Sequence, residues 1–174
     1  RDITERKDAE RLVNLQLQRL RALNEIDRAI SSSIDMRISL DILLSEVLSQ
    51  LGVDAASVLL LNTHNLMLEY VAGKGFHTSA IRQSRLHLGD GYAGQAGLER
   101  RVIHLPNMPE AGEKFKRAEL LKDEEFTEYF AVPLIAKGQL KGVLEIFNRS
   151  SLNSDAEWMN YMETLGGQAA IAGE

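Results

Sequence analysis

The most continuously apolar stretch of the chain lies between Phe130 and Asn148. Two runs of β-branched and aromatic residues there flank a short polar turn that contains Gly138, a pattern typical of a β-hairpin. The second run, Val143–Phe147, is almost continuously apolar, whereas a strand with one solvated face would alternate. We therefore predict that this strand is covered on both faces and lies at the centre of a sheet.

Helical periodicity dominates the N-terminal part of the chain. From about residue 4 to 33, apolar residues recur at three- and four-residue spacing between many charges. Ser31–Ser33 is predicted to end this helix, and Ser39 is predicted to cap a second one that closes at Gly52. The first half of the first helix fits either a coiled-coil-like connector or an amphipathic helix packed on its own domain. Its second half, 23–34, favours its own domain.

The remaining elements are short until the C-terminal helix. Residues 108–126 are charged and irregular, and so long a connection is typical of a lid or pocket wall. Ser154, which stands at capping-box spacing from Glu157, is predicted to cap the C-terminal helix. Strands are predicted at 56–61, 66–72, 85–88 and 102–105, and short helices at 78–84, 91–99 and 114–122.

These elements predict an α+β fold. We expect an antiparallel sheet of five or six strands, with the terminal helices on one face and a ligand pocket on the other. The 174 residues suit one domain with an appendage. The net charge of −5 argues against nucleic-acid binding, and no apolar run approaches the length of a membrane span. The absence of cysteine excludes disulfides and thiolate metal sites and fits a cytoplasmic location.

Few residues suggest chemistry. Residues 89–94 match the dinucleotide fingerprint Gly-x-Gly-x-x-Gly, but only a short helix follows before the next strand, so a nucleotide-binding βαβ unit is not expected. The four histidines show no metal-ligand spacing, and no catalytic constellation stands out, so we predict that the chain is not an enzyme. Glu145 interrupts a covered strand and must either be paired with a Lys or Arg or face a polar pocket.

Three stretches carry a resemblance to the GAF domain, a sensory fold of bacterial signalling proteins and cyclic-nucleotide phosphodiesterases. They are the hairpin 132–148, the glycine segment 88–96 and the closing helix 167–172. The resemblance implies a pocket for a small molecule, surrounded by the first strand, the helix entry in the glycine segment and the start of the hairpin. The expected pocket lining is Ser57, Tyr92, Ala93, Phe130 and Glu145. The ligand and any cofactor stay unidentified, because Leu152 and Ala156 depart from the signature of cyclic-nucleotide-binding members.

Residues 1–7 resemble the end of a PAS sensor domain and its exit helix. The resemblance implies a connector at 1–23 after an upstream PAS domain, followed by a GAF domain at 24–174. It also implies a sensor that relays a signal through its terminal helices to an output domain. HD-GYP cyclic-di-GMP phosphodiesterases, histidine kinases and diguanylate cyclases are outputs of such modules. We expect a parallel homodimer through the terminal helices. The alternative function is a purely structural dimerisation module with a vestigial pocket.

Overall fold

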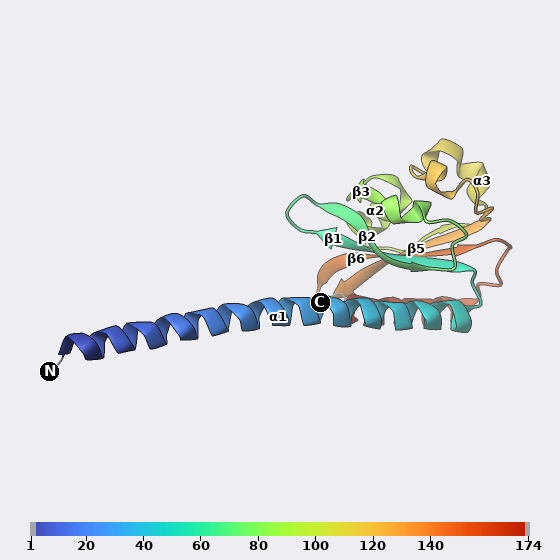
Figure 1. The fold of residues 1–174 in the computed structure, drawn as a ribbon. Coiled ribbons are helices and arrows are strands. Elements are labelled where there is room, and N and C mark those ends of the chain that lie inside the picture. The colour runs from blue at the N-terminus through green and yellow to red at the C-terminus, as the bar shows by residue number, and fades with distance from the viewer. Residues whose placement is uncertain (1–2, 173–174) are drawn as a thin grey trace. The chain divides into compact units, whose positions relative to one another are not determined.

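The protein is described by a computed structural model. It describes the backbone of residues 3–172 (Figure 1). Side chains are described for residues 9–21, 34–112 and 114–172. The chain divides into two compact units, residues 1–36 and 37–174. The second unit contains the whole sheet. No helix in the described part of the chain is both long and apolar enough to cross a membrane.

A single helix, α1 (Ile3–Leu51), replaces the two helices predicted at the N-terminus. Ser31–Ser33 does not interrupt it, and Ser39 lies inside it instead of capping a second helix. Serine costs a helix only about 0.5 kcal/mol relative to alanine, and residues 1–51 contain neither glycine nor proline. Nothing in this stretch therefore forces a break. The helix ends before Gly52, whose φ of +67° is the left-handed conformation that glycine adopts readily.

Six strands form one antiparallel sheet in the order β3-β2-β1-β6-β5-β4 (Figure 1). The predicted α+β class and antiparallel sheet are thus confirmed. In β6, which lies between β1 and β5, Val143–Phe147 is buried throughout, as predicted. The strands are β1 (Ala55–Asn62), β2 (Met67–Lys74), β3 (Arg85–His87), β4 (Ile103–Leu105), β5 (Glu128–Ala136) and β6 (Gln139–Asn148).

Different elements cover the two faces of the sheet (Figure 1). Helix α4 (Ala156–Ala172) and the last part of α1, which buries Leu40, Leu44 and Val47, lie on one side, which we call the helix face. Helix α2 (Gly91–Glu99) and the residues after β4 lie on the other, which we call the distal face.

Residues 108–126, the distal segment, do not form the helix predicted at 114–122. They fold as α3 (Met108–Ala111) and two single turns of 3-10 helix, η2 (Gly112–Lys114) and η3 (Ala118–Leu121). Its buried side chains include Phe115, Arg117 and Leu121. Their spacing of two and then four residues does not fit one face of an α-helix, so packing against the sheet overrides local propensity. A further 3-10 turn, η1 (Ala80–Gln83), precedes β3.

Helix α4 begins one residue later than the capping-box prediction placed it. Asp155, not Ser154, precedes the helix, and its Oδ1 accepts a 2.9 Å hydrogen bond from the Trp158 backbone N–H. Aspartate is among the best N-caps, and its charge also complements the helix dipole. The prediction that Ser154 caps this helix is therefore wrong, and Asp155 is the capping residue.

Two adjacent glycines in α4 provide a matched prediction. A Cβ on exposed Gly167 would meet nothing within 4 Å, whereas a Cβ on buried Gly166 would lie 3.0 Å from Val132 Cγ1. We expect Gly167→Ala to raise the free energy of unfolding by about 1 kcal/mol, because alanine favours the helix. Gly166→Ala should not raise the free energy of unfolding in this way, because the close contact with Val132 offsets the helix preference of alanine. Urea unfolding of both variants measures the difference, and equal effects would contradict this packing.

Candidate functional site

The centre of the distal face carries three polar side chains from three adjacent strands. Ser57 of β1 lies opposite Glu145 of β6, and Tyr129 comes from β5. The Ser57 hydroxyl donates a hydrogen bond to Glu145 Oε1 at 3.3 Å, and the Tyr129 hydroxyl donates to Glu145 Oε2 at 2.5 Å. All three residues are completely buried. A carboxylate in such a place needs a compensating charge.

Arg117 of the distal segment supplies that charge. Its guanidinium contacts both oxygens of Glu145, and the hydrogen bond from Nη1 to Oε1 measures 2.9 Å. Nη1 also donates to Ser84 Oγ at 2.9 Å. Only 8% of Arg117 is exposed. Of the two interpretations of Glu145, pairing with a basic residue is therefore confirmed, and the partner comes from the distal segment, 28 residues away in sequence.

The electrostatics keep this cluster in one protonation pattern. Burial by itself would lower the pKa of Arg117, but the charge and hydrogen bond of Glu145, with a smaller contribution from Tyr129, raise it overall. The guanidinium therefore stays charged. Burial, followed by the neighbouring charge of Glu145, raises the pKa of Tyr129 well above its ordinary 10.0, so the phenol remains a neutral donor.

Aromatic rings surround the polar cluster. Phe115 packs edge-on against Tyr129 with ring centroids 5.1 Å apart, and Phe147 lies 5.1 Å from Tyr129 and 4.9 Å from Phe126. A hollow of about 260 Å³ lies in the distal segment beside these rings. Its lining is largely apolar and consists of Met108, Pro109, Gly112, Phe115, Ala118, Leu121, Lys122, Glu125 and Phe126. The distal face thus combines a buried charge pair with a small apolar hollow.

The glycine segment brings α2 close to β3. A Cβ on Gly94 would lie 2.6 Å from the His87 carbonyl oxygen, so this close approach requires glycine. The strands before and after α2, β3 and β4, lie at opposite edges of an antiparallel sheet. A nucleotide-binding βαβ unit needs parallel strands, so the structure agrees with the prediction that the fingerprint match is accidental.

Four of the five predicted site residues lie on the distal face. Ser57 and Glu145 are hydrogen-bonded to each other, Ala93 belongs to the core cluster on this face, and Tyr92 packs against that cluster. Phe130 does not join them. It faces the helix side, where its ring lies 5.0 Å from the Trp158 ring and 4.1 Å from that of His104. Placing Phe130 with the others was an error of one residue, because neighbouring strand residues point to opposite faces.

Sequence reasoning missed Arg117 and Tyr129. The alternation of β5 against β6 could have identified Tyr129, because Ala131 lies opposite Glu145 and Tyr129 is two residues before it. No sequence signal distinguishes Arg117, which is buried, from the other basic residues of the distal segment, which are exposed. Its role depends on how the segment folds over the sheet.

A second buried carboxylate fastens the other end of the distal segment. Glu124, 1% exposed, accepts hydrogen bonds at 2.8 Å from the backbone N–H groups of His77 and Thr78. Arg149 Nη2 donates to the same carboxylate at 2.8 Å, and Arg149 Nε donates to the Glu124 carbonyl oxygen at 2.8 Å. The segment is thus attached to the bend after β2 and to the end of β6.

Stability should depend on the charge of Glu124. Burial by itself would raise the pKa of Glu124, but the hydrogen bonds from His77, Thr78 and Arg149 lower it below its ordinary 4.5. A lowered folded pKa means that the stabilisation is complete above about pH 4.5 and is lost as pH falls through the folded pKa. At pH 7 we expect Glu124→Gln to lower the free energy of unfolding by about 2 kcal/mol.

This difference between wild type and E124Q should shrink as the pH is lowered from about 5 to about 3. Urea unfolding across this range measures it. The control is Glu125→Gln, because Glu125 is exposed and carries the same charge. A difference between wild type and E124Q that stays constant over the range would contradict the assignment.

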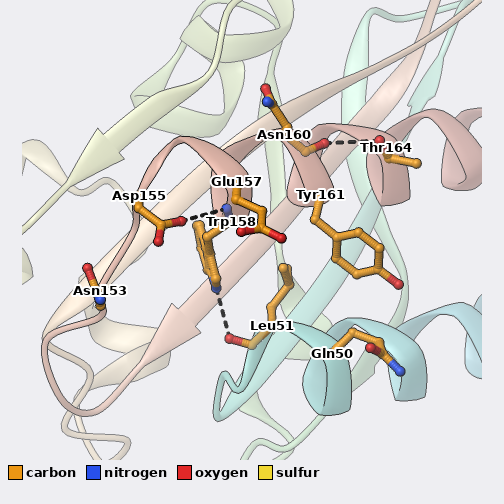
Figure 2. Close-up of a pocket in the computed structure, with 9 residues that line it drawn as sticks. All are labelled: Gln50, Leu51, Asn153, Asp155, Glu157, Trp158, Asn160, Tyr161 and Thr164. Atoms are coloured by element: carbon orange, nitrogen blue, oxygen red, sulfur yellow. Dashed lines mark hydrogen bonds between the residues drawn. The ribbon is translucent and has the colours of Figure 1, made fainter.

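A larger hollow lies on the helix face, between the end of α1 and the start of α4 (Figure 2). It measures about 530 Å³, and most of its side chains are polar. Trp158 Nε1 donates a 2.9 Å hydrogen bond to the Leu51 carbonyl oxygen across it, which ties α4 to the last turn of α1 (Figure 2). The hollow is lined by Gln50, Leu51, Asn153, Asp155, Glu157, Trp158, Asn160, Tyr161 and Thr164.

Neither hollow has the donor set of a metal centre. Among the residues that the structure describes, no group of three or more His, Asp or Glu residues is placed to hold a metal ion. Every buried side-chain nitrogen or oxygen in the described part of the chain has a hydrogen-bond partner. The polar groups of the cluster therefore bond to one another, and a ligand would have to compete with these side chains for hydrogen bonds.

Comparison with known proteins agrees with this geometry. The sequence model of the GAF domain matches residues 33–174. The GAF domain region of a putative membrane protein from Geobacter sulfurreducens has 24% identity, covers 83% of this chain and 97% of its own, and superposes with a TM-score of 0.70. A domain of a putative two-component sensor histidine kinase from Sinorhizobium meliloti has 19% identity. The match covers 76% of this chain and 87% of that domain's chain, with a TM-score of 0.61.

An enzyme shares the same fold. The type II free methionine-R-sulfoxide reductase from Thermoplasma acidophilum has 15% identity, covers 82% of this chain and 94% of its own, and superposes with a TM-score of 0.67. No curated protein matches the chain. Identities this low establish the fold alone, whereas the family match spans most of the sequence. The chain therefore belongs to the GAF domain family.

Proposed function

We propose that this GAF domain is a regulatory sensor of a cytoplasmic bacterial signalling protein. A small molecule binds on the distal face, between the sheet and the distal segment, and the terminal helices relay the change to an output domain. The single observation that carries the proposal is the buried pair of Arg117 and Glu145. It joins the distal segment to the central strand through charges that a polar ligand can compete for.

Energetics favour a functional role for this pair. A buried ion pair often contributes no more stability than apolar residues of the same volume, because desolvation opposes the Coulomb attraction. Here the pair also holds Tyr129, Ser57 and Ser84 in hydrogen bonds. A ligand that engages either charge would leave the other uncompensated and would shift the distal segment. This is the kind of two-state element through which ligands change populations.

A short path leads from this cluster to the helices. Tyr129 contacts Glu145 on the distal face, and its neighbour Phe130 packs on Trp158 on the helix face. Trp158 in turn donates its indole N–H to the carbonyl of Leu51 in α1. Movement of β5 at Tyr129 therefore reaches α4 and the end of α1 through direct contacts. We propose that this path couples the ligand to the helices.

The surrounding architecture is part of the proposal. Residues 1–23 would form the connector after an upstream PAS domain, and 24–174 the GAF domain. The output would be an HD-GYP phosphodiesterase, a histidine kinase or a diguanylate cyclase. A regulatory role is favoured over catalysis because the thiol chemistry open to a reductase needs a cysteine, and these 174 residues contain none. On the described part of the distal face, the Ser57 hydroxyl does donate to a carboxylate, but that carboxylate, Glu145, is already engaged by the Arg117 guanidinium and the Tyr129 hydroxyl.

Native mass spectrometry of freshly purified protein tests the proposal. We expect a non-covalent adduct of metabolite size that is lost on denaturation. Hydrogen exchange with and without that compound should then change in the distal segment and in α4. A protein without an adduct, whose exchange in these regions does not respond to a metabolite extract, would favour the structural alternative.

That alternative is a dimerisation module, and a specific observation favours it. Several apolar side chains of α1 are at least two-fifths exposed, as are Tyr161 and Ile171 of α4. Such side chains suit a parallel homodimer built from the terminal helices, which a sensor could also form. Among the described side chains of the first unit, the exposed large apolar ones are Leu12, Val13, Leu15, Leu17, Leu20 and Ile34.

Light scattering tests this assembly on the full chain and on a form without residues 1–22. We expect a dimer for the full chain and a weaker one for the truncated form, because the truncation removes the exposed apolar side chains between Leu12 and Leu20. A monomer in both cases, or an undiminished dimer after truncation, would rule out α1 as the dimerising element.

A further inference from the structure

Glu124 occupies a ready-made site for an oxyanion. Its two oxygens accept from the consecutive backbone N–H groups of His77 and Thr78, and Arg149 adds a charged donor, all at 2.8 Å. Consecutive backbone donors beside a guanidinium form a donor set that binds carboxylate and phosphate groups. We propose that this donor set binds the oxyanion of an organic acid or phosphate ester, and that Glu124 is an internal competitor that holds the distal segment closed.

The backbones that carry these donors are held by contacts other than the Glu124 carboxylate. The Arg149 backbone N–H donates to Asp54 Oδ2 at 2.7 Å, and its carbonyl accepts from Thr127 Oγ1 at 3.1 Å. Phe76, which precedes the two amide donors, packs on Phe147 in the core with ring centroids 5.4 Å apart. The two amides and the base of the Arg149 side chain are therefore anchored independently of the carboxylate of Glu124.

The competitor is held at a local cost. Glu125, the next residue, has a φ of +59°, a left-handed conformation that costs a non-glycine residue free energy. The closed arrangement of the segment includes this strained residue. The segment is thus closed by the hydrogen bonds of Glu124 and by the Arg117 pair, and an external anion weakens the first of these attachments.

The surroundings indicate what else the ligand carries. The Arg149 guanidinium lies 4.6 Å from the ring centre of Phe126, and Phe126 and Glu125 line the apolar hollow of the distal segment. An apolar body attached to the oxyanion can occupy that hollow, which measures about 260 Å³. Such a body is needed, because a tethered carboxylate competes at an effective concentration in the millimolar range or above. This assignment rests on the proposed sensing function and names the chemical class of its ligand.

The test uses inorganic phosphate and acetate as probes, at constant ionic strength with chloride as the reference. The backbone amide signals of His77 and Thr78 report binding in NMR titrations. We expect Glu124→Ala to bind one or both probes at least about tenfold more tightly than wild type, because the internal competitor is gone. Asp123→Ala, an exposed charge in the same segment, should behave like wild type. The double variant E124A/R149A should lose the binding.

The relative affinity for phosphate and acetate identifies the preferred oxyanion. If E124A is only partly folded, phosphate or acetate should raise its melting temperature by more than that of D123A, and E124A/R149A should show no such rescue. Equal responses of E124A and D123A, or equal effects of chloride and the probes, would overturn the site. That result would leave the proposed sensing function standing, since the adduct and the exchange changes expected there do not depend on Glu124.

Discussion

Replacing Arg117 by methionine is expected to lower the free energy of unfolding by about 3–5 kcal/mol. The substitution keeps most of the side-chain volume but leaves Glu145, which is completely buried, without its compensating charge. Ser84 also loses its donor. The Tyr129 and Ser57 hydroxyls still donate to the carboxylate, yet neutral donors replace only part of a cation's stabilisation. Urea unfolding, with a check that the slope is unchanged, gives the difference.

Two further variants separate the charge from the packing. Lys116→Met changes the same charge at the neighbouring exposed position and should alter stability by no more than about 0.5 kcal/mol. R117M/E145Q removes both charges and should recover at least half of the loss, because the buried charge is gone while Gln can still accept from Tyr129. A loss below about 1 kcal/mol for R117M alone would show that Glu145 does not depend on this partner.

Gly142→Ala is expected to destabilise the protein by about 3 kcal/mol, at the upper end of the usual range for overpacking. An added Cβ would lie 2.0 Å from the Leu59 carbonyl oxygen and 3.0 Å from Leu60 Cα. Both are backbone atoms of the neighbouring strand β1, so no side-chain rotation can relieve the contact. The two central strands would have to separate and lose ladder hydrogen bonds.

The control for this prediction is Gly167→Ala in α4, which should have the opposite sign, because nothing lies within 4 Å of its added Cβ. Thermal and urea unfolding of the two variants side by side give the comparison. A G142A protein as stable as wild type would mean that β1 and β6 are not packed at the register described here.

Local pattern was sufficient for the elements that depend on local chemistry. The hairpin follows from two β-rich runs around a turn, and the observed β5 and β6 match it to within two or three residues. Leu40, Leu44 and Val47 recur at four- and three-residue spacing, a local signal of one helix face, and these residues are buried. The limits of α2 were also predicted, because a glycine-rich start and a short apolar helix are local signals.

Local pattern failed where tertiary contacts outweigh weak preferences. Serines were given too much weight as a helix break in α1, although their cost is small. Residues 114–122 of the distal segment were predicted as an α-helix, but the inward residues there have a spacing that does not fit one helix face, and the chain forms 3-10 turns instead. Phe130 was assigned to the wrong face because the register of β5, and not its composition, decides which side chains face the cluster.

Residue types and their spacing therefore established the α+β class, the central strand, and the need of Glu145 for either a basic partner or a polar pocket. An apolar strand with one carboxylate is readable from residue types alone, because burying an unpaired charge is so unfavourable. The pairing of Arg117 with Glu145 is apparent only in the folded chain. The same is true of the hydrogen bonds that Glu124 accepts from His77, Thr78 and Arg149. These partners are 25 to 47 residues apart in sequence, and chain folding, which no local preference encodes, brings them together.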